Sequence, residues 1–328
     1  MKSNYSQCHT LFALLLTASL SGCGGSGGGD DSTNTGTSTK KVTTSDNQTI
    51  IQSPKNFSTA EINKAYDEIL SASYKGKTNT VDLGLDNTQT YYSYLMGSES
   101  FDFYGLGRDR ILELALSKVS TQDVNCINQG KAKVVGSHQD NGTSELTLSY
   151  EDCTESWNIQ QINGTETVKV KEVSANSIDY TSYVNKATFH RQSDEQDYQV
   201  TGYSHVYFHN ELDVNNKVEL KVNLQYLFTS TTTDYQFAVD AEFDFSYFAD
   251  QEKTTLTYTG TAKDSTLGEV SFNREANEFF SHYDGSTDSI VLTSNNATKL
   301  EKSELGYTQF LLDDNKDGDY ETGTYVGS

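Results

Sequence analysis

The chain has 328 residues and a formal net charge of −22, with 21 tyrosines and 15 phenylalanines but only one proline and one tryptophan. A surface this acidic repels nucleic acid and anionic lipid headgroups, so we exclude nucleic acid as a partner, whereas it attracts divalent cations and favours solubility. Enrichment in Tyr, Phe, Val and Thr, with few strong helix formers, favours strands over helices.

The N-terminus up to Cys23 is typical of an export signal. Lys2 supplies a positive charge, residues 11–16 (LFALLL) form a short apolar core, and small residues precede Cys23. Such a stretch is too short to span a bilayer as a stable anchor. We therefore expect residues 1–22 to be removed as a signal peptide.

The tetrapeptide Leu20-Ser21-Gly22-Cys23 resembles the lipobox of bacterial lipoproteins. This resemblance implies that the thiol of Cys23 receives a diacylglyceryl group and that acyl chains such as palmitate attach the protein to a membrane, each buried methylene contributing about 0.8 kcal/mol. In that family an aspartate after the cysteine directs retention at the inner membrane, so Gly24 implies lipid anchoring at the outer membrane of the cell envelope. The alternative is an ordinary secretory signal that happens to end near a cysteine.

Residues 23–52 are mostly Gly, Ser, Thr, Asp and Asn and contain almost no apolar side chains. Such a composition cannot bury a core, so it predicts a flexible tether. The remaining chain is long enough for one large or two modest domains.

A helical or mixed segment is expected over residues 53–125. Ser58 and Glu61 form a capping-box pattern, which predicts a helix over 59–73. A second apolar stripe at helical spacing predicts a helix over 109–119. The apolar residues are Ile62, Ala65, Tyr66, Ile69 and Leu70 in the first helix, and Ile111, Leu112, Ala115, Leu116 and Val119 in the second.

An antiparallel β region is expected over residues 126–328, because apolar and polar residues alternate there. The alternation is clearest over 218–228 and 235–247. A hairpin that places Phe228 opposite Tyr235 puts every apolar residue opposite another one, and a slip of one residue would turn the whole set outward.

Neighbouring segments extend this sheet. We place Val206 and Phe208 opposite Leu220 and Val218, which assumes a turn at residues 212–215. The fold class is therefore mainly β: a long-stranded antiparallel sheet, either a meander or an open half-barrel, with two N-terminal helices that we expect to cover its apolar face. Further strands are expected at 253–262, 267–274, 287–293 and 305–312.

Two cysteines remain in the exported chain besides Cys23. Cys126 and Cys153 lie at the open end of a hairpin formed by residues 131–138 and 144–150 around an Asn-Gly turn. A bulge or a longer loop is needed to bring the two cysteines level. An exported protein favours a disulfide between them, and two free thiols are the alternative.

The C-terminal sequence 313–321 (DDNKDGDYE) resembles the first half of an EF-hand calcium loop. Side chains at alternate positions can converge on one ion, and Gly318 permits a sharp turn. The resemblance ends at the twelfth position, where Thr324 replaces the bidentate glutamate, so the implied calcium site is weak, with a dissociation constant of about 10⁻⁴ to 10⁻³ M. An acidic hairpin turn without metal is the alternative. The expected ligands are Asp313, Asn315, Asp317, Asp319 through its backbone carbonyl, and Glu321.

His205 and His209 share one strand face with Tyr203 and Tyr207. Two histidines four residues apart in a strand are about 13 Å apart, which is too far for one metal ion. The strip could stack sugars, but cross-strand pairs at a wet surface explain it equally well.

The chain contains no nucleophile elbow, zinc-protease motif, P-loop or dinucleotide fingerprint. We therefore expect no enzyme but a lipid-anchored envelope lipoprotein with a binding or structural role and calcium as its cofactor. An apolar-ligand carrier of the open-barrel type is the alternative, followed by a surface protein that binds glycans. A carrier would need an apolar cavity beneath the sheet.

Overall fold

The computed structural model describes residues 58–84, 86–88, 90–91, 105–156, 158–192, 194–212, 214–251, 253–280, 288–302, 308–313, 315–320 and 325–326. Residues 1–57, which contain the expected signal peptide, Cys23 and the expected tether, lie outside the described residues, as does Glu321. No helix in the described ranges is long and apolar enough to cross a membrane.

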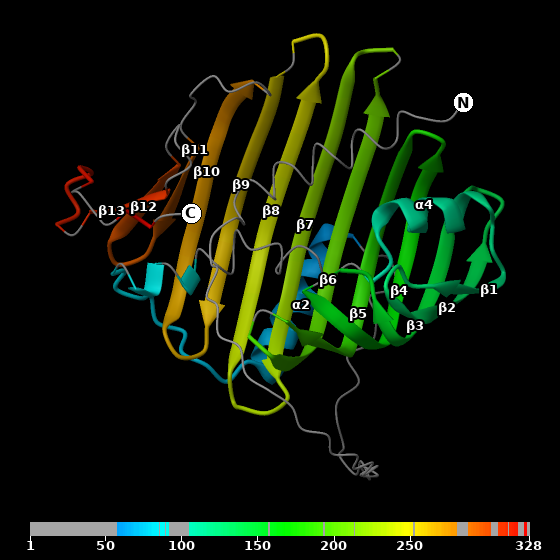
Figure 1. Cartoon of the computed structure of the whole chain (residues 1–328), viewed down its shortest axis with the longest axis horizontal. Helices are drawn as coiled ribbons and strands as arrows, with labels where there is room; N and C mark the ends of the chain where they lie inside the picture. Colours follow the sequence, from blue (N-terminus) through cyan, green and yellow to red (C-terminus); the bar gives the residue numbers. More distant parts are fainter. Residues whose placement is uncertain are drawn as a thin grey trace, which may run out of the picture. The chain divides into compact units, whose positions relative to one another are not determined.

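Within the described ranges, fourteen strands form one sheet, in which each strand pairs antiparallel with its neighbours in sequence (Figure 1). This arrangement confirms the expected mainly-β class with a long-stranded meander. The strands are β1 Thr121–Asn125, β2 Gln129–His138, β3 Ser144–Thr154, β4 Ile159–Ser174, β5 Ser177–Arg191, β6 Gln196–Glu211, β7 Lys217–Ser230, β8 Gln236–Phe248, β9 Lys253–Asp264, β10 Gly268–Phe280, β11 Asp288–Thr293, β12 Ala297–Lys302, β13 Thr308–Asp313 and β14 Tyr325–Val326.

The first predicted helix is confirmed as α2, Thr59–Ser73. Ser58 Oγ accepts from the Glu61 amide at 3.4 Å, and Glu61 Oε2 accepts from the Ser58 amide at 3.3 Å, so both halves of the capping box are present. The buried positions, Ile62, Ala65, Tyr66 and Ile69, are four of the five residues in the predicted stripe.

The second predicted helix is α4, Arg108–Leu116, which is shorter than expected. It ends early because Ser117 caps it and Lys118 adopts a left-handed conformation with φ of 50°. Its buried residues are Ile111, Leu112, Leu114 and Ala115, whereas Leu116 is 46% exposed. The predicted stripe therefore holds for Ile111, Leu112 and Ala115 and is wrong for Leu116.

The sheet has an apolar face, which carries Leu220, Val222 and Leu224 of β7, and an opposite face, which carries Asn223 and Gln225. Cross-strand partners share a face, so the register extends both faces from β7 to its neighbours. The two helices do not lie on the same face, which corrects the expectation that both cover the apolar one.

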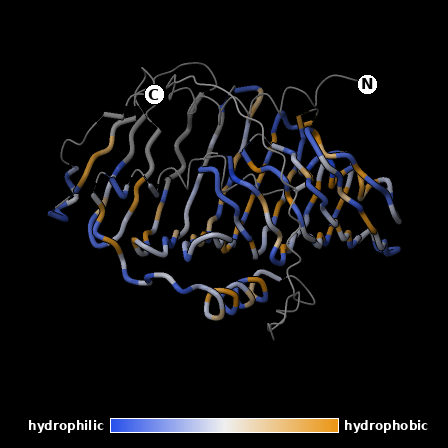
Figure 2. The backbone as a smooth tube through the Cα atoms, turned by 60° about the horizontal axis from the view of Figure 1, so that its bottom comes forward, coloured by the Kyte–Doolittle hydropathy of each residue, from blue (hydrophilic) through white to orange (hydrophobic). Residues whose placement is uncertain are grey.

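Helix α4 lies on the apolar face and α2 on the opposite face (Figures 1 and 2). The Arg108 guanidinium stacks 3.8 Å from the ring centroid of Phe208, which belongs to the apolar face. The Asn63 side chain of α2 accepts a 3.0 Å hydrogen bond from Gln225 on the opposite face. Consequently the middle strands are buried on both faces, and Gln225 is only 3% exposed.

The predicted register of the central hairpins is wrong by two residues. Phe228 pairs with Phe237 rather than Tyr235. Phe208 pairs with Leu220 rather than Val218. A shift of two residues leaves every side chain on the same face, so the hydrophobic pattern cannot detect it.

Candidate functional site

The C-terminal loop begins where β13 ends, at Asp313. Asp313 pairs with Ala297 of β12 and is only 6% exposed. Its Oδ2 atom accepts a 3.2 Å hydrogen bond from the amide of Gly318, so the carboxylate is directed into the loop. Gly318 has φ of +88°, a left-handed conformation that glycine adopts without strain, and the expected sharp turn is present.

Two further side chains of the loop shape the backbone. Asn315 Oδ1 accepts from the amide of Asp317 at 2.9 Å, and Asp317 Oδ1 accepts from the amide of Asp319 at 2.9 Å. These hydrogen bonds form two Asx turns that order the backbone of the loop, while Asn315 and Asp317 remain exposed. The loop therefore brings Asp313, Asn315 and Asp317 into one turn, as the sequence pattern indicates.

The buried carboxylate of Asp313 provides a test of whether a cation fits this loop. Its Oδ1 atom is buried and has no hydrogen-bond partner among the described residues. A buried carboxylate oxygen without a partner is costly unless a donor or a cation satisfies it. Calcium prefers oxygen ligands of this type, so a bound cation is one way to satisfy this atom. Glu321, the expected extra ligand, lies outside the described residues.

Tyr320 lies at the edge of the same loop. Burial raises the pKa of its phenol, and the negative charge of Asp313 raises it further, whereas Lys299 acts in the opposite direction. Negative charge is therefore concentrated in this turn, with Lys299 as a nearby positive charge.

Among the described residues, one group of Cys, His, Asp or Glu side chains has converging ligand atoms, namely Cys126, Cys153 and Glu155, and the carboxylates of the C-terminal loop do not form a second one. Cys126 and Cys153 form the predicted disulfide, with their Cα atoms 5.6 Å apart, so neither sulfur is a thiolate. Glu155 Oε1 accepts from the amide of Ile127 at 3.1 Å. This group is therefore a disulfide-linked corner and not a metal site.

A loop and a bulge in the β2–β3 hairpin place Cys126 beside Cys153. Residues 139–143 form the loop between β2 and β3, in which Gly142 has φ of +89°. One extra residue in β3, near Asp152, shifts the register to β2 between Gln129 and Lys131 and the register to β4 between Tyr150 and Cys153. The expected bulge and longer loop are both present.

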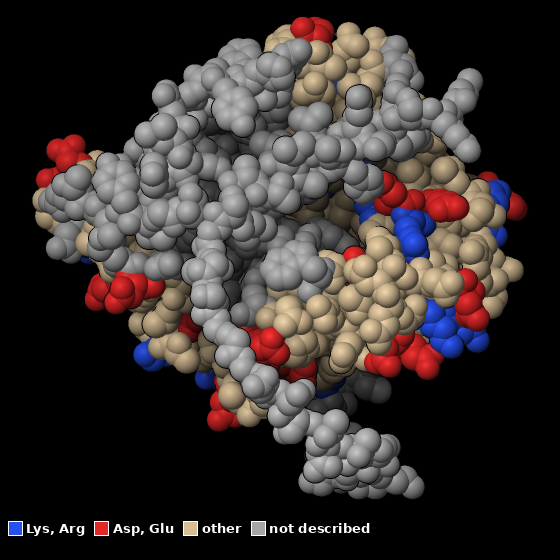
Figure 3. All heavy atoms as spheres, viewed as in Figure 1, with Lys and Arg blue, Asp and Glu red and all other residues tan. Residues whose placement is uncertain are grey.

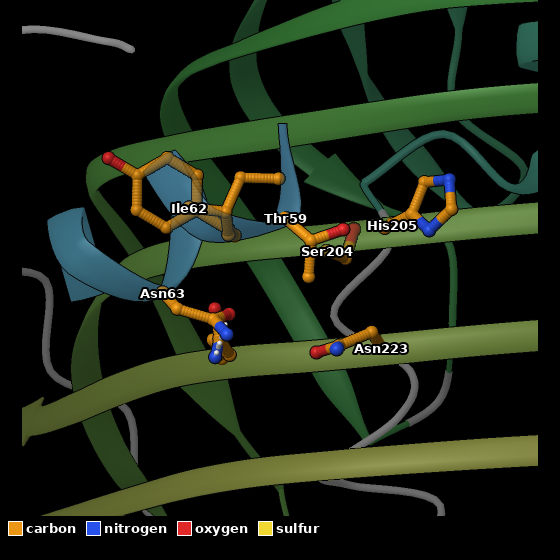
Figure 4. A pocket seen from close by; sticks show the side chains of 8 residues that line it. Thr59, Ile62, Asn63, Ser204, His205 and Asn223 are labelled. Atoms are coloured by element: carbon orange, nitrogen blue, oxygen red, sulfur yellow. Dashed lines mark hydrogen bonds between the residues drawn. The ribbon is translucent and has the colours of Figure 1, made fainter. Parts of the chain in front are cut away.

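A small polar cavity lies between the first turn of α2 and strands β6 and β7 (Figure 4). Its volume of about 20 Å³ has room for one or two water molecules. In Figure 4 the Asn63 side chain extends from α2 toward the strands. The polar lining residues are Thr59, Asn63, Ser204, His205, Asn223 and Gln225.

Gln225 is a buried amide at the wall of this cavity. Its Nε2 atom donates to Asn63 at 3.0 Å and to Asp240 at 3.1 Å, whereas Oε1 is buried without a partner in the described ranges. A carboxylate accepts and does not donate, so Asp240 sets the orientation of the Gln225 amide. The cavity therefore suits a small hydrogen-bond donor such as water and is too small for a sugar ring.

The Tyr/His strip of β6 is largely engaged in the protein itself. Tyr203 is 1% exposed and stacks on Tyr183 at a centroid distance of 4.8 Å. His205 Nε2 lies 2.8 Å from Asp179, and His209 Nε2 lies 3.3 Å from Glu211.

The residues opposite the two histidines differ from those expected. Asn223 lies opposite His205 and Glu219 lies opposite His209, whereas the predicted register, with Val206 opposite Leu220, would place Lys221 and Lys217 there. The cause is the same two-residue shift of register.

Charge on the visible surface is mixed. Figure 3 shows Lys and Arg side chains beside Asp and Glu side chains on the part of this face that carries α4 and the first strands. Lys131 and Glu151 form one such exposed pair at 3.0 Å. Exposed pairs of this kind contribute little to stability.

No protein-family model, no curated protein sequence and no solved structure matches this chain. Its assignment therefore depends on its own residues and their geometry. Among these, the C-terminal loop and the disulfide corner were predicted from the sequence, whereas the buried amide of Gln225 was not, because its burial depends on α2.

Proposed function

We propose that this protein is a lipid-anchored lipoprotein of the cell envelope, with a binding or structural role and a C-terminal loop that binds calcium. The observation that carries the calcium assignment is the buried Oδ1 atom of Asp313, which has no partner among the described residues. A bound calcium ion would satisfy it and would neutralise the carboxylates of Asp313 and Asp317.

Two features support the envelope location. Leu20-Ser21-Gly22-Cys23 has the lipobox pattern. The Cys126–Cys153 disulfide suits an oxidising compartment outside the cytoplasm. A weak calcium site also suits such a compartment, because calcium sites of extracellular modules work at about 10⁻⁴ to 10⁻³ M.

Metabolic labelling with palmitate tests the lipid anchor. We expect Cys23→Ser to abolish labelling and to release the protein from membranes. Cys8→Ser is the matched control, because Cys8 lies inside the expected signal peptide and should not affect labelling. Undiminished labelling of Cys23→Ser would refute the lipoprotein assignment.

A further inference from the structure

A carboxyl group is buried in the middle of the apolar face, away from the C-terminal loop. Glu166 of β4 pairs with Leu148 on one side and with Val184 on the other, and it is only 7% exposed. Tyr150 donates a 2.5 Å hydrogen bond to its Oε2 atom, and the hydroxyl of Ser182 also bonds to this carboxyl. The sheet therefore holds an acid where its neighbours are apolar.

Hydroxyl groups extend from this acid across the sheet. Ser182 of β5 lies opposite Ser204 of β6, and their hydroxyls are 3.4 Å apart. The phenol of Tyr226 on β7 lies beside these two serines. All three side chains are fully buried, so the chain of hydroxyls is shielded from water.

The segment 105–116, which contains α4, is attached to the same acid through Tyr150. The Leu106 amide donates to the Tyr150 hydroxyl at 3.1 Å, while that hydroxyl donates to Glu166. Gly105 lies so close that a Cβ atom there would be 2.1 Å from the hydroxyl. Helix α4 packs on β4, and Arg108 stacks on Phe208, so this segment covers the sheet around Glu166.

No strong counter-charge balances Glu166. The ion pairs formed by the described residues do not include it, and the groups that face it from β3, β5 and β7 are the phenols of Tyr150, Tyr180 and Tyr226. From α4, Arg108 and Asp109 act on Tyr180 with opposite charge. Burial raises the pKa of Glu166, and its hydrogen bonds only partly oppose this effect.

We propose that the segment 105–116 is a proton-controlled cover of the apolar face, closed while Glu166 is protonated and opened when Glu166 ionises. An ionised carboxylate is costly in a dry, apolar site, and displacement of the segment would let water reach it. Opening would also expose Phe208 and its apolar neighbours. This proposal is independent of the calcium assignment.

The sign of the pH dependence follows from the raised pKa. A carboxyl group that holds its proton more tightly in the closed state favours that state at low pH, and this advantage is lost as pH rises. With one linked proton, the closing equilibrium weakens by at most about tenfold per pH unit.

Hydrogen exchange measured by mass spectrometry on the mature full-length protein, from about pH 5 to about pH 8, tests this proposal. After correction for intrinsic exchange, we expect protection of residues 105–116 to fall with rising pH by up to about tenfold per unit. Glu166→Gln keeps the shape but cannot ionise, so its protection should not depend on pH. Glu172→Gln, an exposed site on the same strand, should behave like the wild type.

Tyr150→Phe provides a second readout that does not depend on Glu166→Gln folding. It removes the bond to the Leu106 amide, so we expect weaker protection of the segment at every pH while the pH dependence remains. Equal pH dependence in wild type and Glu166→Gln would overturn the proposal. Unchanged protection of the segment in Tyr150→Phe would show that the bond between Tyr150 and Leu106 does not hold the segment on the sheet.

Discussion

The hydroxyl group of Tyr66 in α2 lies 2.8 Å from the carbonyl oxygen of Val239 in β8. It also lies 3.0 Å from the carbonyl oxygen of Tyr226, the cross-strand partner of Val239. One phenol thus joins the helix to two neighbouring strands in a fully buried position. Burial also raises its pKa well above the ordinary value, so it remains a donor at any physiological pH.

Removal of this hydroxyl should loosen α2 from the sheet. We expect Tyr66→Phe to lower the free energy of unfolding by about 1 to 2 kcal/mol. The two buried carbonyl oxygens would lose this donor, and the phenyl ring offers no donor in its place. Tyr74→Phe is the control, since the Tyr74 hydroxyl bonds only to the carbonyl of Lys77 at an exposed site, at 3.0 Å. Urea denaturation of both variants measures the difference, and equal losses would contradict the proposed importance of the Tyr66 contact.

Calcium should stabilise the protein through the C-terminal loop. With a dissociation constant of about 10⁻⁴ to 10⁻³ M, calcium at roughly 10 mM should add about 1.4 to 2.7 kcal/mol and raise the melting temperature. Magnesium should add less, because it requires a tighter octahedral shell and retains its water.

Two variants separate specific binding from general screening of an acidic surface. Asp317→Ala should remove most of the calcium-induced shift in a thermal melt, whereas Asp314→Ala removes an equal charge outside the alternating ligand set and should retain it. An equal shift in the wild type and Asp317→Ala would show that the loop is only a turn.

The disulfide should be complete in the exported protein. Intact-mass analysis after alkylation should find no free thiol at Cys126 or Cys153 before reduction. Reduction should lower stability by about 3 to 4 kcal/mol, because the bond closes a loop with a sequence separation of 27 residues. Two alkylated cysteines without prior reduction would contradict the pairing.

Removal of the Gln225 amide should make the free energy of unfolding depend on pH through Asp240. Its hydrogen bond lowers the pKa of Asp240, whereas burial, the larger effect, raises that pKa. In Gln225→Met the pKa of Asp240 should rise further, and a raised folded-state pKa means that stability decreases as pH increases.

We therefore expect Gln225→Met to be more destabilising at about pH 7 than at about pH 4, by urea denaturation at both values. Asp240→Asn in the same background removes the ionisable group and should abolish this difference. A pH-dependent loss that persists in the double variant would have to originate at another group.

Local features of the fold were accessible from the sequence alone. Ser58 and Glu61 predicted the start of α2, because a capping box is completed within four consecutive residues. The alternation of apolar residues over 218–228 predicted which side chains share a face, since a strand repeats every two residues. Cys126 and Cys153 were paired correctly because the hairpin between them limits their separation.

The tertiary structure decided the features that depend on distant contacts. The hairpin register differed by two residues, because both registers bury the same face and only the turn distinguishes them. Strand β12, Ala297–Lys302, was not predicted, since Thr, Lys and Glu interrupt its apolar pattern. Glu166 was also missed, although it lies in phase with Val168 and Val170, the one local signal that an acid occupies the apolar face.

The candidate sites divide in the same way. The alternation of Asp313, Asn315 and Asp317 was visible in the sequence, because the candidate calcium loop is built from consecutive residues. Whether Asp313 is buried, and whether its Oδ1 atom has a partner, depends on the tertiary structure around the end of β13. The placement of α2 and α4 on opposite faces could not be derived from their apolar stripes, because a stripe shows that a helix must be covered but not which surface covers it.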